Sequence, residues 1–125
     1  MDLPLIFVVI EDNVIIAEDI AEAIREYAAS AVVHVWKRTE AQLDRLTELP
    51  GLCAAFVSMT AAEFARTGLH QMITARGGAI VMLDSDDPTA SVDASGWIYL
   101  ERPFTTGQIH WALKSLGIAK TDPVP

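Results

Sequence analysis

Acidic, hydroxyl and cationic side chains follow several apolar runs of the sequence, and they are the residues best suited to chemistry. Glu11 and Asp12 come directly after 5–10, an apolar run without alternation. The other candidates follow later apolar runs: Ser58, Asp84, Ser85 and Arg102. Two adjacent acids at the end of a buried strand put negative charge where open α/β sheets bind ligands. A purely structural alternative is that Asp12 or Asn13 caps the next helix, which explains one polar residue but not two acids.

The elements that must position these residues are predicted from the apolar runs and their spacing. Unbroken Val/Ile/Phe-rich runs predict strands that are covered on both faces, as in a parallel sheet. The sequence contains five such runs, at 5–10, 31–36, 52–57, 79–83 and 97–100. His34 lies in the second run without another His or Cys nearby, so we interpret it as a strand-face residue rather than a metal ligand.

Helical spacing of apolar residues appears between the predicted strands. It predicts a helix over 14–28 and a second helix from a Thr39 cap to Pro50. Helical structure is also expected over 61–75, where Gly68 delays or breaks it, and at most a short helix over 88–95. A last helix is expected from Thr105 or Thr106 to Gly117. Strands alternating with helices favour a doubly wound parallel sheet with helices on both faces. In such a fold the carboxyl ends of the strands converge on one crevice, which would gather the candidate residues.

Length and composition limit the classes of function. With 125 residues the chain fits one domain, which we expect over 1–120, followed by a loose tail at 121–125. A net charge of −8 disfavours nucleic acid and anionic membrane surfaces as partners. No apolar run is long enough for a membrane span. The single Cys53 suits a reducing cytoplasm, where we expect the protein to be located.

Two segments carry a resemblance to a known family. Val9-Ile10-Glu11-Asp12-Asn13 and Tyr99-Leu100-Glu101-Arg102-Pro103-Phe104 resemble the opening and closing signatures of response-regulator receiver domains, the CheY-like family of two-component signalling. The resemblance covers about 5–117. It implies a flavodoxin-like three-layer sandwich with five parallel strands in the order 2-1-3-4-5. The short polar stretch at 88–95 then implies a shortened fourth helix.

The resemblance also implies roles for the strand-end residues. In that family the first acid pair binds Mg²⁺, an Asp after the third strand accepts phosphate from a histidine kinase, a Thr or Ser ends the fourth strand, and a Lys precedes Pro after the fifth. By that comparison Glu11 and Asp12 match the metal pair. Three positions depart from the pattern: Ser58 replaces the acceptor Asp, Asp84 replaces the Thr or Ser with Ser85 one residue late, and Arg102 replaces the Lys.

These departures change the chemistry that the site can perform. A Ser hydroxyl has no anionic oxygen near neutral pH, and it needs a base to become a nucleophile. Ser58 also removes one hard anionic ligand from the implied Mg²⁺ site, so at most a weak Mg²⁺ site remains at Glu11 and Asp12. Asp84 would repel a phosphoryl group, and Arg102 could clamp Asp84 or the Glu11–Asp12 pair as a fixed ion cluster.

The sequence therefore predicts a degenerate receiver. It would be a non-enzymatic module of phosphorelay signal transduction that works through protein–protein interaction without ordinary aspartyl phosphorylation. Its partner would be a histidine kinase or a downstream effector, and an exposed Trp111 would indicate a homodimer or kinase-binding face on the last helix. Two alternatives stay open: an atypical receiver that is phosphorylated at Ser58 or Asp84, and a flavodoxin-like module that binds a small ligand.

Overall fold

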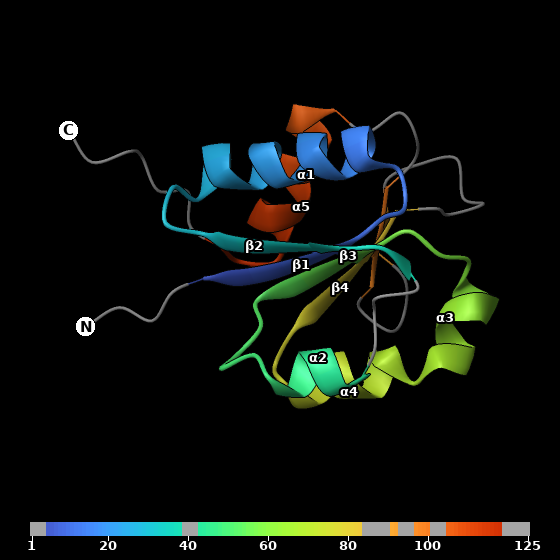
Figure 1. Ribbon diagram of the computed structural model, residues 1–125. Coiled ribbons are helices and arrows are strands. Elements are labelled where there is room, and N and C mark those ends of the chain that lie inside the picture. The colour runs from blue at the N-terminus through green and yellow to red at the C-terminus, as the bar shows by residue number, and fades with distance from the viewer. Residues whose placement is uncertain (1–4, 39–42, 84–90, 93–96, 101–104, 119–125) are drawn as a thin grey trace.

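A mostly parallel sheet lies between two layers of helices in the computed structural model (Figure 1), which describes residues 5–38, 43–83, 91–92, 97–100 and 105–118. The parallel strands are β1 (Ile6–Ile10), β2 (Val32–Trp36), β3 (Ala54–Val57), β4 (Ala79–Met82) and β6 (Ile98–Tyr99). Their order is β2-β1-β3-β4-β6, which confirms the expected doubly wound sheet with the order 2-1-3-4-5. A two-residue strand, β5 (Ser91–Val92), pairs antiparallel with the outer edge of β6.

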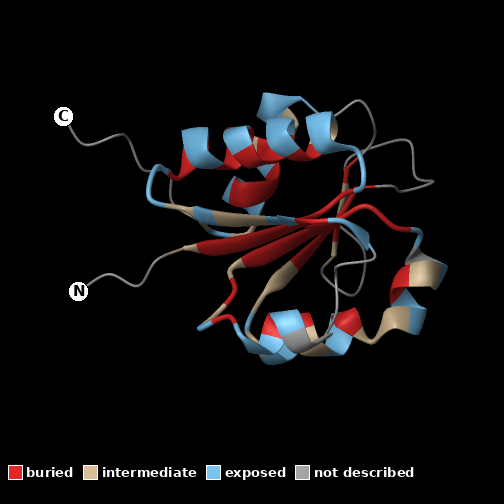
Figure 2. Ribbon diagram, in the orientation of Figure 1, coloured by how far each residue is buried: buried red, intermediate tan, exposed pale blue. Residues whose placement is uncertain are grey.

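The central strands are buried on both faces, which explains why their sequences do not alternate. Every residue of β1 and of β3 is buried (Figure 2), because helices cover both sides of a doubly wound sheet. The edge strand β2 differs, since Val32 and Val35 are exposed while Trp36 is buried. The sheet is thus anchored by β1 and β3, and their carboxyl ends carry two of the candidate residues, Glu11 and Ser58.

Helices α1 (Val14–Tyr27) and α5 (Thr106–Ser115) cover one face of the sheet, and α2 (Leu43–Thr47), α3 (Ala61–Thr67) and α4 (Leu69–Ala75) cover the other (Figure 1). Of the two caps considered for α1, Asn13 is the one used, because its Oδ1 accepts hydrogen bonds from the backbone N–H groups of Ile15 and Ile16. Among the described helices, none has the length and apolar character that a membrane crossing needs.

Two segments refine the expectations from the sequence. Gly68 does break the helical segment 61–75 into α3 and α4, because it adopts a left-handed conformation with φ of 76° that ends one helix and starts the next. In the stretch where a shortened helix was expected, Ser91 and Val92 instead form β5, since their backbone pairs with β6. The rest of that stretch, the Thr39 cap and the tail at 121–125 lie outside the described residues.

Candidate functional site

The pairing of the strands brings Glu11 and Ser58 to the same edge of the sheet. Ile10 pairs with Val57, so the residues that follow them in the chain leave neighbouring strands at the same level. The backbone N–H of Ser58 donates to the carbonyl of Ile10 at 2.9 Å, and that of Glu11 donates to Trp36 at 3.0 Å. These bonds extend the sheet by one residue and fix both candidate positions on rigid strands.

Among the described residues, Glu11 and Ser58 are the buried polar ones, with 5% and 7% of their surfaces exposed. The Oε1 atom of Glu11 accepts a hydrogen bond from the backbone N–H of Asn13 at 3.2 Å, so this carboxylate turns back toward the start of α1. A Ser at the end of β3 is smaller and uncharged compared with an Asp, which lets it be buried beside a carboxylate without electrostatic repulsion.

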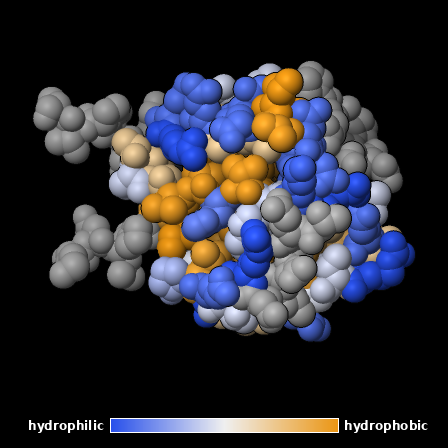
Figure 3. All heavy atoms as spheres, in the orientation of Figure 1, coloured by the Kyte–Doolittle hydropathy of each residue, from blue (hydrophilic) through white to orange (hydrophobic). Residues whose placement is uncertain are grey.

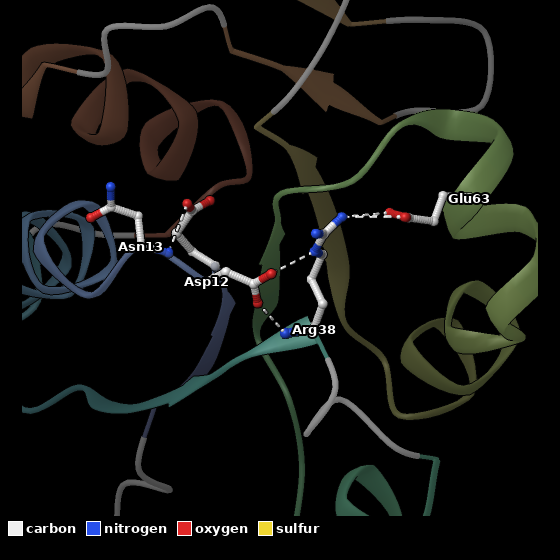
Figure 4. Close-up of polar contacts among 5 residues, drawn as sticks. Asp12, Asn13, Arg38 and Glu63 are labelled. Carbon is white, nitrogen blue, oxygen red and sulfur yellow. Dashed lines mark hydrogen bonds and ion pairs between the residues drawn. The ribbon is translucent and has the colours of Figure 1, made fainter.

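Asp12 points outward and is held by Arg38, a residue that the sequence analysis did not select (Figure 4). The Oδ1 atom of Asp12 accepts from the backbone N–H of Arg38 at 2.7 Å, and Oδ2 accepts from the Nε atom of Arg38 at 2.8 Å. Both carboxylate oxygens are therefore engaged by one residue. The register explains this contact. Ile10 pairs with Trp36, Asp12 lies two residues after Ile10, and Arg38 lies two residues after Trp36.

The same guanidinium also reaches Glu63 in the first turn of α3. The Nη1 atom of Arg38 lies 3.1 Å from Oε1 and 3.3 Å from Oε2 of Glu63. Thr60 caps α3 by accepting from the backbone N–H of Glu63, which fixes the position of that residue. Arg38 thus links the end of β1, the end of β2 and the start of α3 in one ion cluster, which we call the Arg38 cluster: Asp12, Arg38 and Glu63.

The Arg38 cluster changes the protonation of its members in the direction that stabilises their charges. The backbone and side-chain hydrogen bonds from Arg38 lower the pKa of Asp12 below its ordinary value of 3.8. The side-chain hydrogen bond to Asp12, with a smaller effect of Glu63, raises the pKa of Arg38. Because the side chains are 35–47% exposed, solvent screens these interactions and their effect on stability is modest.

Among the described residues, the ligands available to a divalent metal ion are limited. Mg²⁺ requires several oxygen ligands in near-octahedral geometry. Asp12 already gives both of its oxygens to Arg38, and Ser58 offers no charge. Across the described ranges, no three His, Cys, Asp or Glu side chains are grouped so that they could hold a metal ion. The cation that Asp12 binds is an arginine of the same chain.

Three of the candidate residues, Asp84, Ser85 and Arg102, lie outside the described residues, so the proposed Arg102 clamp stays a prediction. The cation that holds Asp12 is Arg38, and the sequence carried a signal for it. Lys37 and Arg38 directly follow the second apolar run, where the reasoning that selected Glu11 and Asp12 applies equally. Glu63 had no comparable signal, because its contact depends on where α3 begins.

The histidines make their described contacts away from Ser58. His34 lies beside Trp36 on β2, and His70 lies 4.8 Å from Trp97, measured between ring centroids. His110 on α5 packs against Tyr27, and its Nε2 atom lies 2.9 Å from the carbonyl oxygen of Ala23 on α1. These contacts connect elements of the fold, and they give no support to a Ser–His nucleophile pair.

Comparison with known proteins found solved structures with a similar fold. No protein-family model matches the sequence, and no curated protein matches it. A response regulator receiver domain protein from Bacillus halodurans is 17% identical, with 91% of this chain and 97% of that chain aligned and a TM-score of 0.67. A response regulator receiver protein from Burkholderia phymatum is 14% identical, with 93% and 98% aligned and a TM-score of 0.56. The chain therefore has the fold of response regulator receiver domains.

Proposed function

We propose that this chain is a receiver-like domain that acts in signal transduction by binding other proteins, without ordinary aspartyl phosphorylation. The fold supports a receiver-like role. The loss of the phosphorylation chemistry rests on the site at the carboxyl edge of the sheet. The observation that carries the proposal is the engagement of both Asp12 oxygens by Arg38.

Arg38 competes directly with a divalent cation for Asp12. Arg38, which lies just beyond β2, holds the carboxylate with one hydrogen bond from its backbone N–H and one from its guanidinium Nε, so Mg²⁺ would have to displace these donors and also dehydrate. In the receiver family the metal neutralises the oxygens of the incoming phosphoryl group. With Asp12 occupied, we infer that Mg²⁺ binds weakly at best and that this neutralisation is lost.

Ser58, at the position of the phosphate acceptor, also supports the proposed loss of phosphorylation. Its hydroxyl has no anionic oxygen near neutral pH to attack a phosphohistidine. With 7% of its surface exposed, Ser58 is also poorly accessible to a Ser/Thr kinase, which disfavours the alternative of a phosphoserine receiver. Phosphoryl transfer would thus lack both the acceptor and the metal.

The interaction surface that we propose for a signalling partner lies on α5. Trp111 is 40% exposed there, whereas its neighbours Ala112 and Leu113 are buried in the core. An exposed Trp on a helix that is fixed by core contacts is a common energetic anchor of protein interfaces. A cytoplasmic histidine kinase or a downstream effector fits this proposal, and the domain would act as a non-enzymatic binding module.

Incubation with acetyl phosphate and Mg²⁺, followed by intact-mass measurement, tests the proposal. We expect the wild-type chain to gain no phosphoryl group, because Ser58 is not an anionic acceptor and Asp12 is held by Arg38. A receiver domain with an Asp at the end of its third strand, treated in parallel, serves as the positive control. A stable phosphoryl adduct on the chain, mapped to Asp84 or Ser58, would contradict the proposal and favour an atypical phosphorylated receiver.

A further inference from the structure

Helix α3 is attached to the rest of the molecule by few side chains. Of its residues whose burial is described, only Phe64 is buried, whereas Ala62, Ala65 and Arg66 are exposed. Figure 3 shows mostly hydrophilic side chains on the right of the view, where α3 lies in Figure 1. A short helix with one buried apolar side chain opens more easily than the core elements, because local stability depends on buried contacts.

The junction with α4 lets α3 open separately. Gly68, with φ of 76°, ends α3 and starts α4. Thr67 spans the junction, since its Oγ1 donates to the carbonyl of Phe64 at 2.7 Å and accepts from the backbone N–H of Leu69 at 3.1 Å. Leu69 and Ile73 anchor α4 in the core. The glycine is therefore a point at which α3 can move while α4 stays packed.

The Arg38 cluster connects α3 to the carboxyl edge of the sheet. Figure 4 shows the guanidinium of Arg38 between the carboxylates of Asp12 and Glu63. Asp12 accepts from the backbone N–H and from Nε, whereas Glu63 accepts from Nη1. The two acids thus use different donors of one arginine and do not compete for them. The bonds from Asp12 fix the guanidinium in the orientation that reaches Glu63, which lowers the entropy cost of the second contact.

We propose that Arg38 couples the state of Asp12 to the opening of α3. While Asp12 binds Arg38, the guanidinium is held beside Glu63 and the first turn of α3 stays docked. A cation that takes Asp12 away from Arg38 removes this support, so α3 opens more often. The coupling is reciprocal, because an open α3 leaves Arg38 less ordered and Asp12 more available to that cation.

The expected coupling is small. The side chains of the cluster are 35–47% exposed, and solvent screens ion pairs of this kind. Phe64 also keeps α3 docked most of the time in either state. We therefore expect the opening equilibrium of α3 to change about two- to fivefold. The coupling uses the Arg38–Asp12 contact on which the proposed function also rests, but it does not depend on whether phosphoryl transfer is lost.

Native-state amide hydrogen exchange of the full chain, followed by NMR, tests this coupling. The amides of 64–67 report the opening of α3, and those of Ile20 and Ile24 report the buried side of α1. Asp12→Asn keeps the size of a side chain that reaches α3 through Arg38 and removes its charge. We expect the α3 amides to exchange about two- to fivefold faster in Asp12→Asn and in Glu63→Gln, with a smaller change in α1.

The double variant Asp12→Asn/Glu63→Gln separates the coupling from independent effects. It should exchange no faster in α3 than Glu63→Gln alone, because both changes interrupt the same connection. Asp19→Asn is the matched control, since it makes the same chemical change at an exposed acid of α1. It should leave α3 exchange unchanged.

Three results would overturn the proposal. The first is unchanged or slower α3 exchange in Asp12→Asn, and the second is equal acceleration in α1 and α3, which would indicate a loss of overall stability. The third is additive acceleration in the double variant. Incubation with acetyl phosphate bears on the proposed function alone, so the failure of either proposal can be recognised separately.

Discussion

At the scale of single residues, Arg38 determines the character of the strand-end site. It converts Asp12 from an available ligand into one half of an ion pair, and it extends the cluster to Glu63. An arginine suits this position better than a lysine, because its planar donors can reach two carboxylates at once. The Asp12 carboxylate is thus paired with a cation of the chain itself.

The pKa of Asp12 provides a test at this scale. Because Arg38 lowers the folded-state pKa of Asp12 below 3.8, the ion pair contributes stability above pH 4, and this contribution is lost as the pH falls through the lowered pKa. We expect Arg38→Gln to return the pKa of Asp12 part of the way toward its ordinary value, because the backbone N–H of residue 38 still donates, and to lower the free energy of unfolding slightly at pH 7. The variant and the wild type should converge in stability once the pH lies below the lowered pKa of Asp12.

Carboxyl titration by NMR and chemical denaturation at neutral and acidic pH measure these two effects. Arg25→Gln is the matched control, because Arg25 is an exposed cation in the last turn of α1. It should leave the pKa of Asp12 unchanged. An unchanged Asp12 pKa in Arg38→Gln would show that the ion pair does not form in solution.

At the scale of the elements, the short helices α2 and α4 are held to each other by specific hydrogen bonds. Arg76, which ends α4, donates through Nε to the carbonyl of Leu46 at 3.2 Å and through Nη2 to that of Thr47 at 2.7 Å. These carbonyls lie in the last turn of α2, so the arginine ties the end of α4 to the end of α2. The next turn leads into β4 through Gly77 and Gly78, where the chain passes close to the core.

Gly78 tests how tightly this turn packs. A Cβ atom there would lie 2.9 Å from Cδ2 and Cγ of Leu52 and 3.0 Å from Cγ2 of Ile73, so Leu52 and Ile73 would have to shift. We expect Gly78→Ala to lower the free energy of unfolding by about 1–3 kcal/mol. Chemical denaturation measures the change.

Gly107 in α5 offers the opposite control, because a Cβ there would make only an ordinary contact of 3.8 Å with Oγ1 of Thr105. We expect Gly107→Ala to stabilise the protein by about 0.5–1 kcal/mol through its helix propensity. If both variants had the same effect on stability, the expected clash of a Cβ at residue 78 with Leu52 and Ile73 would be contradicted.

At the scale of the whole molecule, the sheet could be predicted from the sequence because its central strands are buried on both faces. The runs that contain β1 and β3 have no alternation, and Asn13, Gly68 and Thr105 act locally at helix ends. The antiparallel strand β5 could not be predicted, since two residues carry no periodicity and their pairing with β6 is set by tertiary structure.

The candidate site was predictable in part for the same reason. Glu11 and Ser58 follow strand runs, and the pairing of β1 with β3 brings them to one edge. The contact between Asp12 and Arg38 depends on the register of β2 against β1, which composition alone does not determine. The roles that the resemblance assigns to Asp84, Ser85 and Arg102 stay predictions, because those residues lie outside the described chain.

The central claim is that Arg38 engages both carboxylate oxygens of Asp12 at the acidic edge of the sheet and so hinders Mg²⁺ binding there. A Mg²⁺ titration of the isotope-labelled chain, followed by the backbone amide signals of Glu11, Asp12 and Arg38, tests this claim most directly. We predict no saturating shift of these signals below millimolar Mg²⁺ in the wild type, and tighter binding in Arg38→Gln. Saturation of all three signals at micromolar Mg²⁺ in the wild type would contradict the account.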